Sequence, residues 1–281
     1  MSKNIYIASA ARTPVGSFQG SLSSLTAPEL GAHAIKASLT QANIEKSKIS
    51  EAIFGNVVGA GLKQAPARQA MRNAGLPDAC GATTINKVCG SGMKAIMLAT
   101  DLLQADNGET ILAGGMESMS NAPYLIPKAR AGLRMGHQEI QDSLFLDGLE
   151  DAETGGSMGS FAQNTADEYQ LTRQDMDTYA TQSVTRARKA IEEKSLESEI
   201  TPIEIGAETI CDDEQPGRAK LDKISSLRPA FKADGTITAA NSSSISDGAS
   251  SVILTSNESM LNVEPLARIV GHATHSIHPS Q

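Results

Sequence analysis

A cysteine set among glycines is the residue whose surroundings point most directly to chemistry. Cys89 lies in the run 86–94, after a strand pattern and before a helix pattern. The N–H groups at a helix N-terminus stabilise an anion, so a thiol placed there is expected to hold more thiolate and to act as a nucleophile. Gly90 and Gly92 permit a sharp turn and the close approach of a ligand. Spacing alone leaves open the commoner alternative, a small buried cysteine without a chemical role.

Other chemical patterns in the sequence are weaker. Cys80, Cys89 and Cys211 are irregularly spaced, which predicts neither a disulfide framework nor a zinc site and is typical of a reduced, cytoplasmic protein. The segment 59–64 follows a strand pattern but lacks the third glycine of a dinucleotide-binding loop. Three histidines near the end are expected to be ordinary strand or loop residues: His272, His275 and His278.

Strand and helix patterns alternate through the first 115 residues. This alternation predicts an α/β fold with a mainly parallel sheet that helices cover on both faces. Strands are expected at 5–11, 52–58, 83–88 and 110–113, and helices at 27–40, 66–74 and 92–103. Gly114 and Gly115 are expected to end the fourth strand. The helix at 92–103 is apolar around nearly its whole circumference, which predicts burial on all sides.

The pattern changes at about residue 120. We expect residues 120–245 to form an inserted domain, with a helix that Thr172 caps and that buries one face containing Met176, Tyr179 and Ala180. Residues 250–255 have a buried-strand pattern, which predicts a return to the first sheet. Residues 266–277 are expected to begin one more strand.

Composition excludes several classes of protein. The chain has 281 residues and a net charge of -8, which argues against a nucleic-acid partner or an anionic membrane surface. No stretch approaches the ~18 apolar residues of a membrane span, and the first residues lack the apolar run of a signal peptide.

Five segments, in this order along the chain, resemble thiolases. They are Ala10–Pro14, Asn86–Gly92, Ala113–Ser120, Leu227–Phe231 and Thr238–Ala249. The resemblance implies an acyltransferase of the acetyl-CoA acetyltransferase type, active in fatty acid metabolism, that condenses two acetyl-CoA or cleaves 3-oxoacyl-CoA through an acyl group on Cys89. It also implies a homo-oligomer whose partners are acyl-CoA and CoA, with no metal and no further cofactor.

The resemblance also implies a domain organisation. We expect an N-terminal thiolase domain at 1–119 that residues 246–265 close, a loop domain at 120–245 that binds CoA, and the first strand of a truncated C-terminal domain at 266–281. Three family motifs are absent from the sequence: the one that supplies the activating histidine in Gly-His-Pro, the one with the second cysteine, and the one with the asparagine that holds a water. We therefore expect this chain alone to have little or no turnover.

Matching the loop domain to the family implies six CoA contacts. They are Leu149, Met158, Arg218, Phe231, Ala239 and Ser243. Taken singly, the apolar members are as easily explained by core packing, and Arg218 by a solvated loop charge. Ser157 stands where short-chain thiolases have histidine, which leaves the acyl-chain preference open.

Two other functions remain alternatives. One is a non-catalytic CoA-binding module, such as a truncated pseudoenzyme. The other is a β-ketoacyl synthase relative, which the segments 86–92 and 241–249 disfavour because they look like thiolase.

Overall fold

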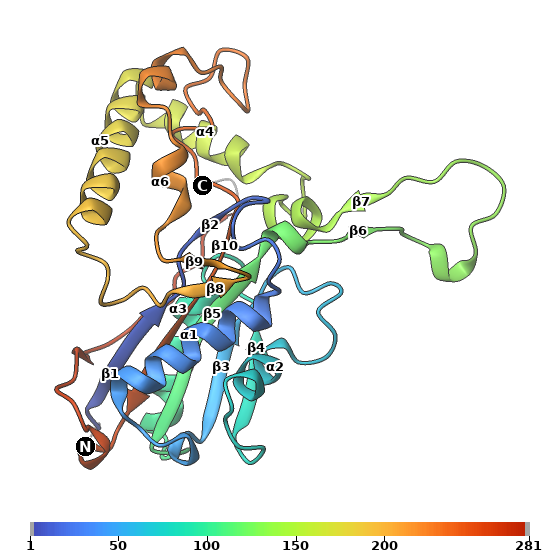
Figure 1. Cartoon of the computed structure of the whole chain (residues 1–281). Helices are drawn as coiled ribbons and strands as arrows, with labels where there is room; N and C mark the ends of the chain where they lie inside the picture. The colour runs from blue at the N-terminus through green and yellow to red at the C-terminus, as the bar shows by residue number, and fades with distance from the viewer. Residues whose placement is uncertain (1–2, 279–281) are drawn as a thin grey trace. The chain divides into compact units, whose positions relative to one another are not determined.

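The computed structural model describes residues 3–278, which form two compact units (Figure 1). The first unit consists of the described residues up to Asn121, together with Leu196–Glu214 and Ser246–Thr274. The second consists of Ala122–Ser195, Gln215–Ile245 and the described residues from His275 onward. Residues 196–214, which the sequence places in the inserted domain, thus belong to the first unit.

A seven-stranded sheet organises the first unit, in the order β11-β1-β10-β5-β3-β4 with β2 beside β10. Strands β1 to β5 run in one direction, and β10 and β11 run in the other. The expected α/β fold is confirmed, and the predicted return of residues 250–255 is the antiparallel strand β10 between β1 and β5. The strand bounds are β1 Ile5–Arg12, β2 Gly16–Ser17, β3 Glu51–Gly55, β4 Gly81–Ile85, β5 Thr110–Ser118, β10 Ser246–Thr255 and β11 Ala267–Ile269.

Helices cover both faces of this sheet, as predicted. Helix α1 (Ala27–Ala42) begins at a capping box in which the Thr26 N–H donates to Glu29 Oε2 at 2.8 Å. It packs with α2 (Pro66–Asn73) on one face, and α3 (Ser91–Gln104) packs on the other. The first core includes Leu30, Ile35, Phe54, Met71 and Leu112, and the second Ile53, Ala95, Ala99, Leu103 and Ile111.

Helix α3 is buried on one side only, so the prediction of burial all round is wrong for this structure. Ala95, Ala99 and Leu103 recur every fourth residue and pack on the sheet. Met93, by contrast, is 67% exposed, and Ile96, Met97, Leu98 and Leu102 are half-buried. The apolar composition of α3 led to the wrong prediction because it does not show which apolar side chains face the sheet and which face outward.

Strand β5 continues through Gly114 and Gly115, so the prediction that these glycines end the strand is wrong. A Cβ on Gly114 would overlap the carbonyl oxygen of Ser250 on β10. A Cβ on Gly115 would lie 3.5 Å from Gly92 Cα on α3. Gly114 therefore serves close packing against β10 rather than a turn, and Gly115 lies in ordinary contact with α3.

Arg12 attaches residues 196–214 to the sheet. Its guanidinium donates to Asp213 at 2.7 and 2.9 Å and to Glu199 at 2.6 Å. The Asp213 carboxylate also accepts the Val15 N–H at 2.8 Å. This segment forms a hairpin of β8 (Ile203–Ile205) and β9 (Glu208–Ile210), and Ile203 is buried in the first core. The charged contacts explain why the segment belongs to the first unit.

The second unit is mainly helical. It contains the hairpin β6 (Tyr124–Leu125) and β7 (Gln141–Asp142), a π-helix at Phe145–Leu149, α4 (Met158–Glu168), α5 (Arg173–Glu192) and most of α6 (Glu214–Arg218). Thr172 caps α5 as predicted, and its hydroxyl accepts the Asp175 N–H at 3.1 Å. The expected buried face of α5 is wrong, because only Ala180 is buried and Tyr179 is 75% exposed.

The expected strand over residues 266–277 is much shorter in the structure. Only Ala267–Ile269 forms a strand, β11, and it pairs with β1 in the first unit's sheet. Val270 and the histidines after it lie in irregular chain, and His272 Nε2 lies 3.0 Å from Asp101 Oδ1 on α3. Residues 279–281, the end of the segment 266–281 that we expected to begin a C-terminal domain, lie outside the described residues.

Candidate functional site

Cys89 lies on a tight turn between β4 and α3, as the sequence predicts. The strand ends at Ile85 and the helix begins at Ser91. The Gly90 N–H donates to the Lys87 carbonyl at 3.1 Å, and the Ser91 N–H donates to the Val88 carbonyl at 3.1 Å. Cys89 is exposed on this turn. The alternative of a small buried cysteine therefore does not describe Cys89.

The first turn of α3 lies directly on the backbone of two strands. A Cβ on Gly55, the last residue of β3, would lie 2.5 Å from Ser91 Cβ. A Cβ on Gly92 would lie 3.8 Å from the Gly115 backbone N on β5. The helix N-terminus, and the turn that carries Cys89, are thereby held at the carboxyl ends of the parallel strands. Ligand sites of α/β folds commonly lie at this edge.

Glu117 fixes the loop that lies beside this turn. Its carboxylate accepts the Val57 N–H at 2.8 Å, the Val58 N–H at 3.2 Å and the Asn56 side-chain amide at 2.7 Å. Burial raises the pKa of Glu117, and the two backbone donors act in the opposite direction. The Asn56 N–H donates in turn to the carbonyl of Ile85, the last residue of β4. Glu117 is therefore linked to the strand that leads to Cys89.

Sequence reasoning missed this role of Glu117. The residue stood inside a matched segment, but a single carboxylate among small residues gives no sign that it will accept three hydrogen bonds from a distant loop. Ser91 was missed for a different reason: a serine just before a helix pattern suggests a cap, whereas its hydroxyl bonds Lys87 and Val88 of the preceding turn.

The other two thiols differ from Cys89. Cys80 is buried, and its Sγ donates to the Gly81 carbonyl at 3.3 Å. Burial, above all, raises the pKa of Cys80 to about 11. Cys211 is exposed, as Cys89 is, but it lies just after β9 rather than at the start of a helix.

In the second unit the ring of Phe231 packs against Gly159, the residue after Met158. Gly159 follows Met158 at the start of α4, and a Cβ there would overlap the ring of Phe231. Both Met158 and Phe231 remain 41% exposed. Neither side chain is therefore closed off in a core. Ser157 caps α4 and accepts the Ser160 N–H at 3.2 Å, so this departure from the family has a local structural use.

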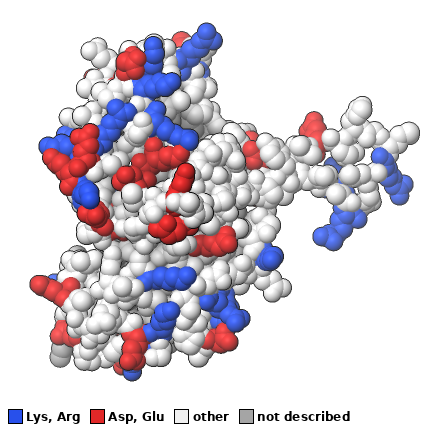
Figure 2. Space-filling view, in the orientation of Figure 1, with Lys and Arg blue, Asp and Glu red and all other residues white. Residues whose placement is uncertain are grey.

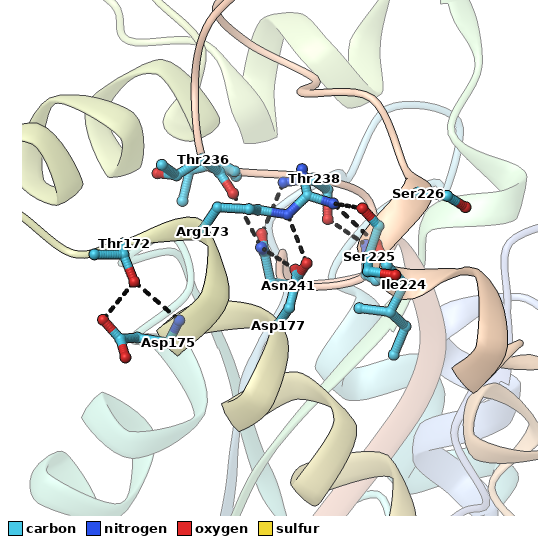
Figure 3. Close-up of polar contacts among 12 residues, drawn as sticks. Thr172, Arg173, Asp175, Asp177, Ile224, Ser225, Ser226, Thr236, Thr238 and Asn241 are labelled. Atoms are coloured by element: carbon cyan, nitrogen blue, oxygen red, sulfur yellow. Dashed lines mark hydrogen bonds and ion pairs between the residues drawn. The ribbon is translucent and has the colours of Figure 1, made fainter.

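A polar network holds the segment that contains Ala239 and Ser243 (Figure 3). Asn241 accepts the Thr238 N–H at 2.7 Å and donates to the Thr236 carbonyl at 3.1 Å and to Asp177 of α5 at 3.2 Å. Arg173 pairs with the same Asp177 at 2.7 Å. The segment is thus tied to α5, and it leaves the side chains of Ala239 and Ser243 exposed.

The remaining two predicted contacts also lie in the second unit. Leu149 ends the π-helix and is half-buried, and Arg218 ends α6 and is exposed. Over residues 3–278 the structure contains no cluster of three His, Cys, Asp or Glu side chains suited to a metal ion. No helix of the described chain is long and apolar enough to span a membrane.

Comparison with known proteins agrees with the geometry. Residues 5–258 match the family model of the thiolase N-terminal domain. The chain belongs to the thiolase family. It is 46% identical over 275 residues to acetyl-CoA acetyltransferase of Schizosaccharomyces pombe, which covers 95% of this chain and 70% of that protein. It is 44% identical to acetyl-CoA acetyltransferase of Pseudomonas aeruginosa, over 99% of this chain and 73% of that one.

A solved thiolase has the same fold. The crystal structure of a thiolase from Ascaris suum in complex with coenzyme A superposes with a TM-score of 0.91 at 38% identity. The match covers 96% of this chain and 70% of the other. These relatives assign the chain to the thiolase-type acyltransferases.

The three thiols allow a direct test of the thiolase site. We expect iodoacetamide at about pH 8 to alkylate Cys89 first, Cys211 more slowly and Cys80 last, because only thiolates react and Cys80 is buried and protonated at that pH. Raising the pH increases Cys80 labelling only as it approaches 11, the value to which burial raises its pKa. Peptide mapping of a time course measures the order. Labelling of Cys211 before Cys89 would contradict the site.

Proposed function

We propose that this chain carries the acyl-accepting half of a thiolase reaction, with Cys89 as the nucleophile. The observation that supports it most is the exposed Cys89 at the N-terminus of α3, on the edge where the parallel strands end. The Cys89 thiolate attacks the carbonyl carbon of an acetyl-CoA thioester, the C–S bond to CoA breaks, and the CoA thiolate leaves and takes up a proton. The products are acetyl-Cys89 and free CoA.

The same intermediate serves the reverse direction. The Cys89 thiolate attacks C3 of a 3-oxoacyl-CoA, the C2–C3 bond breaks, and the carbon that leaves takes a proton to give acetyl-CoA. Both directions require a group that moves a proton at the α-carbon, and such groups contribute about 10²–10⁴-fold to the rate. Among the family motifs, those that supply this group are absent from the sequence.

We expect acetyl-CoA to acetylate Cys89 while multiple turnover stays slow. Intact-protein mass spectrometry and peptide mapping would locate one acetyl group on Cys89, and Cys89→Ala would remove it. Cys211 supplies the matched control, because an exposed thiol that reacts nonspecifically would also be acetylated. Retained CoA binding without acetylation would favour the non-catalytic alternative, and rapid turnover would show that other residues supply the proton transfer.

The proposed CoA surface lies in the second unit. Met158 and Phe231 would flank the apolar pantetheine, and Ser243 offers a hydrogen bond. Leu149 and Ala239 would extend the apolar contact, and Arg218 would meet a phosphate or the adenine. The solved relative from Ascaris suum, whose structure contains coenzyme A, supports this proposal.

We expect Phe231→Ala to weaken CoA binding about tenfold, the effect of removing about 1.4 kcal/mol of apolar contact. Isothermal titration calorimetry measures the change. Tyr169→Ala is the control, because Tyr169 is an exposed aromatic at the opposite end of α4 from Met158. Equal affinities for Phe231→Ala and the unaltered chain would remove Phe231 from the CoA site.

We further propose that the protein is a homo-oligomer and that the β6–β7 hairpin contributes to the contact. The hairpin exposes a set of large apolar side chains, which is typical of an interaction site: Tyr124, Ile126, Leu133, Met135 and Ile140. Figure 2 shows the hairpin with uncharged side chains over much of its length and basic side chains toward its tip. On the rest of the face shown, basic and acidic groups are interspersed.

A double variant Leu133→Lys/Met135→Lys is expected to lower the sedimentation coefficient, because it places two charges in the contact. Val270→Lys is the control, since Val270 is also exposed but lies outside the hairpin. If the double variant and the control sediment alike, the hairpin does not hold copies of the chain together.

A further inference from the structure

The residue before Cys89 has an unusual backbone conformation. Val88 has φ of +46°, in the left-handed region that a β-branched side chain rarely adopts. It occupies the second position of the turn that the Gly90 N–H closes onto the Lys87 carbonyl. Because Cys89 is the next residue, the conformation of Val88 sets the direction in which the chain presents the thiol.

Side chains on both sides hold Val88 in this conformation. Ser91 Oγ donates to the Val88 carbonyl at 2.6 Å and accepts the Lys87 N–H at 2.8 Å. Asn86 Oδ1 accepts the Val88 N–H at 2.9 Å. Both backbone polar groups of Val88 are therefore bonded to side chains.

Ser91 is built into this position. It is buried, and its Cβ lies where a Cβ on Gly55 would come within 2.5 Å. Its hydroxyl does not cap the helix, because the N–H that it accepts belongs to Lys87, outside α3. The hydroxyl serves the turn rather than the helix.

We propose that Ser91 is a positioning residue for Cys89, with Asn86 as its weaker counterpart. The Ser91 hydroxyl holds Val88 in the left-handed conformation and so fixes where the thiol emerges at the start of α3. The inference rests on the proposed function, in which Cys89 is the nucleophile. The quantity it predicts is different: the change in the reactivity of the Cys89 thiol when the Ser91 hydroxyl is removed.

The first measurement is the rate of Cys89 alkylation by iodoacetamide in Ser91→Ala. We expect a fall of about tenfold, the size of effect that loss of one buried hydrogen-bonding group produces. Cys211 should react at an unchanged rate, and Cys80 should stay protected because the fold is intact. The matched control is Ser38→Ala. Ser38 is also buried, with hydrogen bonds to Ile35 O at 3.0 Å and Ser251 Oγ at 2.9 Å, but it lies on α1, on the opposite face of the sheet.

A double-mutant cycle with Val88→Gly separates positioning from simple destabilisation. Glycine adopts a positive φ without strain, so the hydrogen bonds of the Ser91 hydroxyl are less needed to maintain that conformation. In the Val88→Gly background we expect Ser91→Ala to change the Cys89 rate less than about twofold, a clear departure from additivity. Val88 is half-exposed, so this change leaves the core intact.

Each outcome decides the question. An unchanged Cys89 rate in Ser91→Ala, or the same tenfold loss in both backgrounds, overturns the inference. If Ser91→Ala unfolds and exposes Cys80, Asn86→Ala takes its place in the cycle, because Asn86 is exposed and its side chain accepts the Val88 N–H. An unchanged Cys89 rate in Asn86→Ala, or the same loss in both backgrounds, then overturns the inference. If Cys89 in the unaltered chain reacts no faster than Cys211, the proposed function fails instead.

Discussion

The contact between α3 and the bare backbone of two strands is the constraint on which the first unit depends. A Cβ on Gly55 would come within 2.5 Å of Ser91 Cβ, whereas Cβ atoms on Gly92 and Gly115 would make ordinary contacts at 3.8 and 3.5 Å. The missing side chain at Gly55 lets the N-terminus of α3 lie on the carboxyl end of β3, and the Gly92 backbone lies against that of Gly115 within β5. A single Cβ at Gly55 would have to displace Ser91, and with it the turn that carries Cys89. The packing of α3 on the sheet therefore also determines the position of the turn that carries Cys89.

The central strand β10 explains how the chain accommodates a second unit. Ser118, the last residue of β5, pairs with Asp247 near the start of β10. Asp247 is buried, and one of its carboxylate oxygens accepts the Ser120 N–H at 2.9 Å. The chain therefore leaves the sheet and returns to it at adjacent points. An insertion between these points leaves the register of β5 and β10 intact, and only its residues 196–214 belong to the first unit.

The sequence predicted what depends on local pattern. Neighbouring residues alone determine four features that were predicted: the alternating strands and helices, the capping box at Thr26, the cap at Thr172 and the turn at Cys89. It failed where partners lie far away. Gly114 resembled a strand end because the reason for glycine there is the close approach of the Ser250 carbonyl on a distant strand. The outer face of α3 and the exposed Tyr179 face of α5 looked buried because apolar residues alone do not reveal which neighbours exist. Arg12 could not be assigned to Asp213, about two hundred residues away, without the fold.

Position 88 has a left-handed backbone conformation but contains valine, a residue that disfavours it. Glycine would adopt the left-handed conformation freely, whereas valine gives up about 1–2 kcal/mol there. Glycine, however, would widen the range of conformations open to the turn and so the positions open to Cys89. Valine restricts that range, and the hydrogen bonds from Asn86 and Ser91 offset the strain because each contributes about 0.5–1.5 kcal/mol. A residue that resists the conformation, held in it by its neighbours, defines the direction of the thiol more narrowly than one that accepts it. Strain of this kind collects at functional sites because the surrounding structure can maintain it.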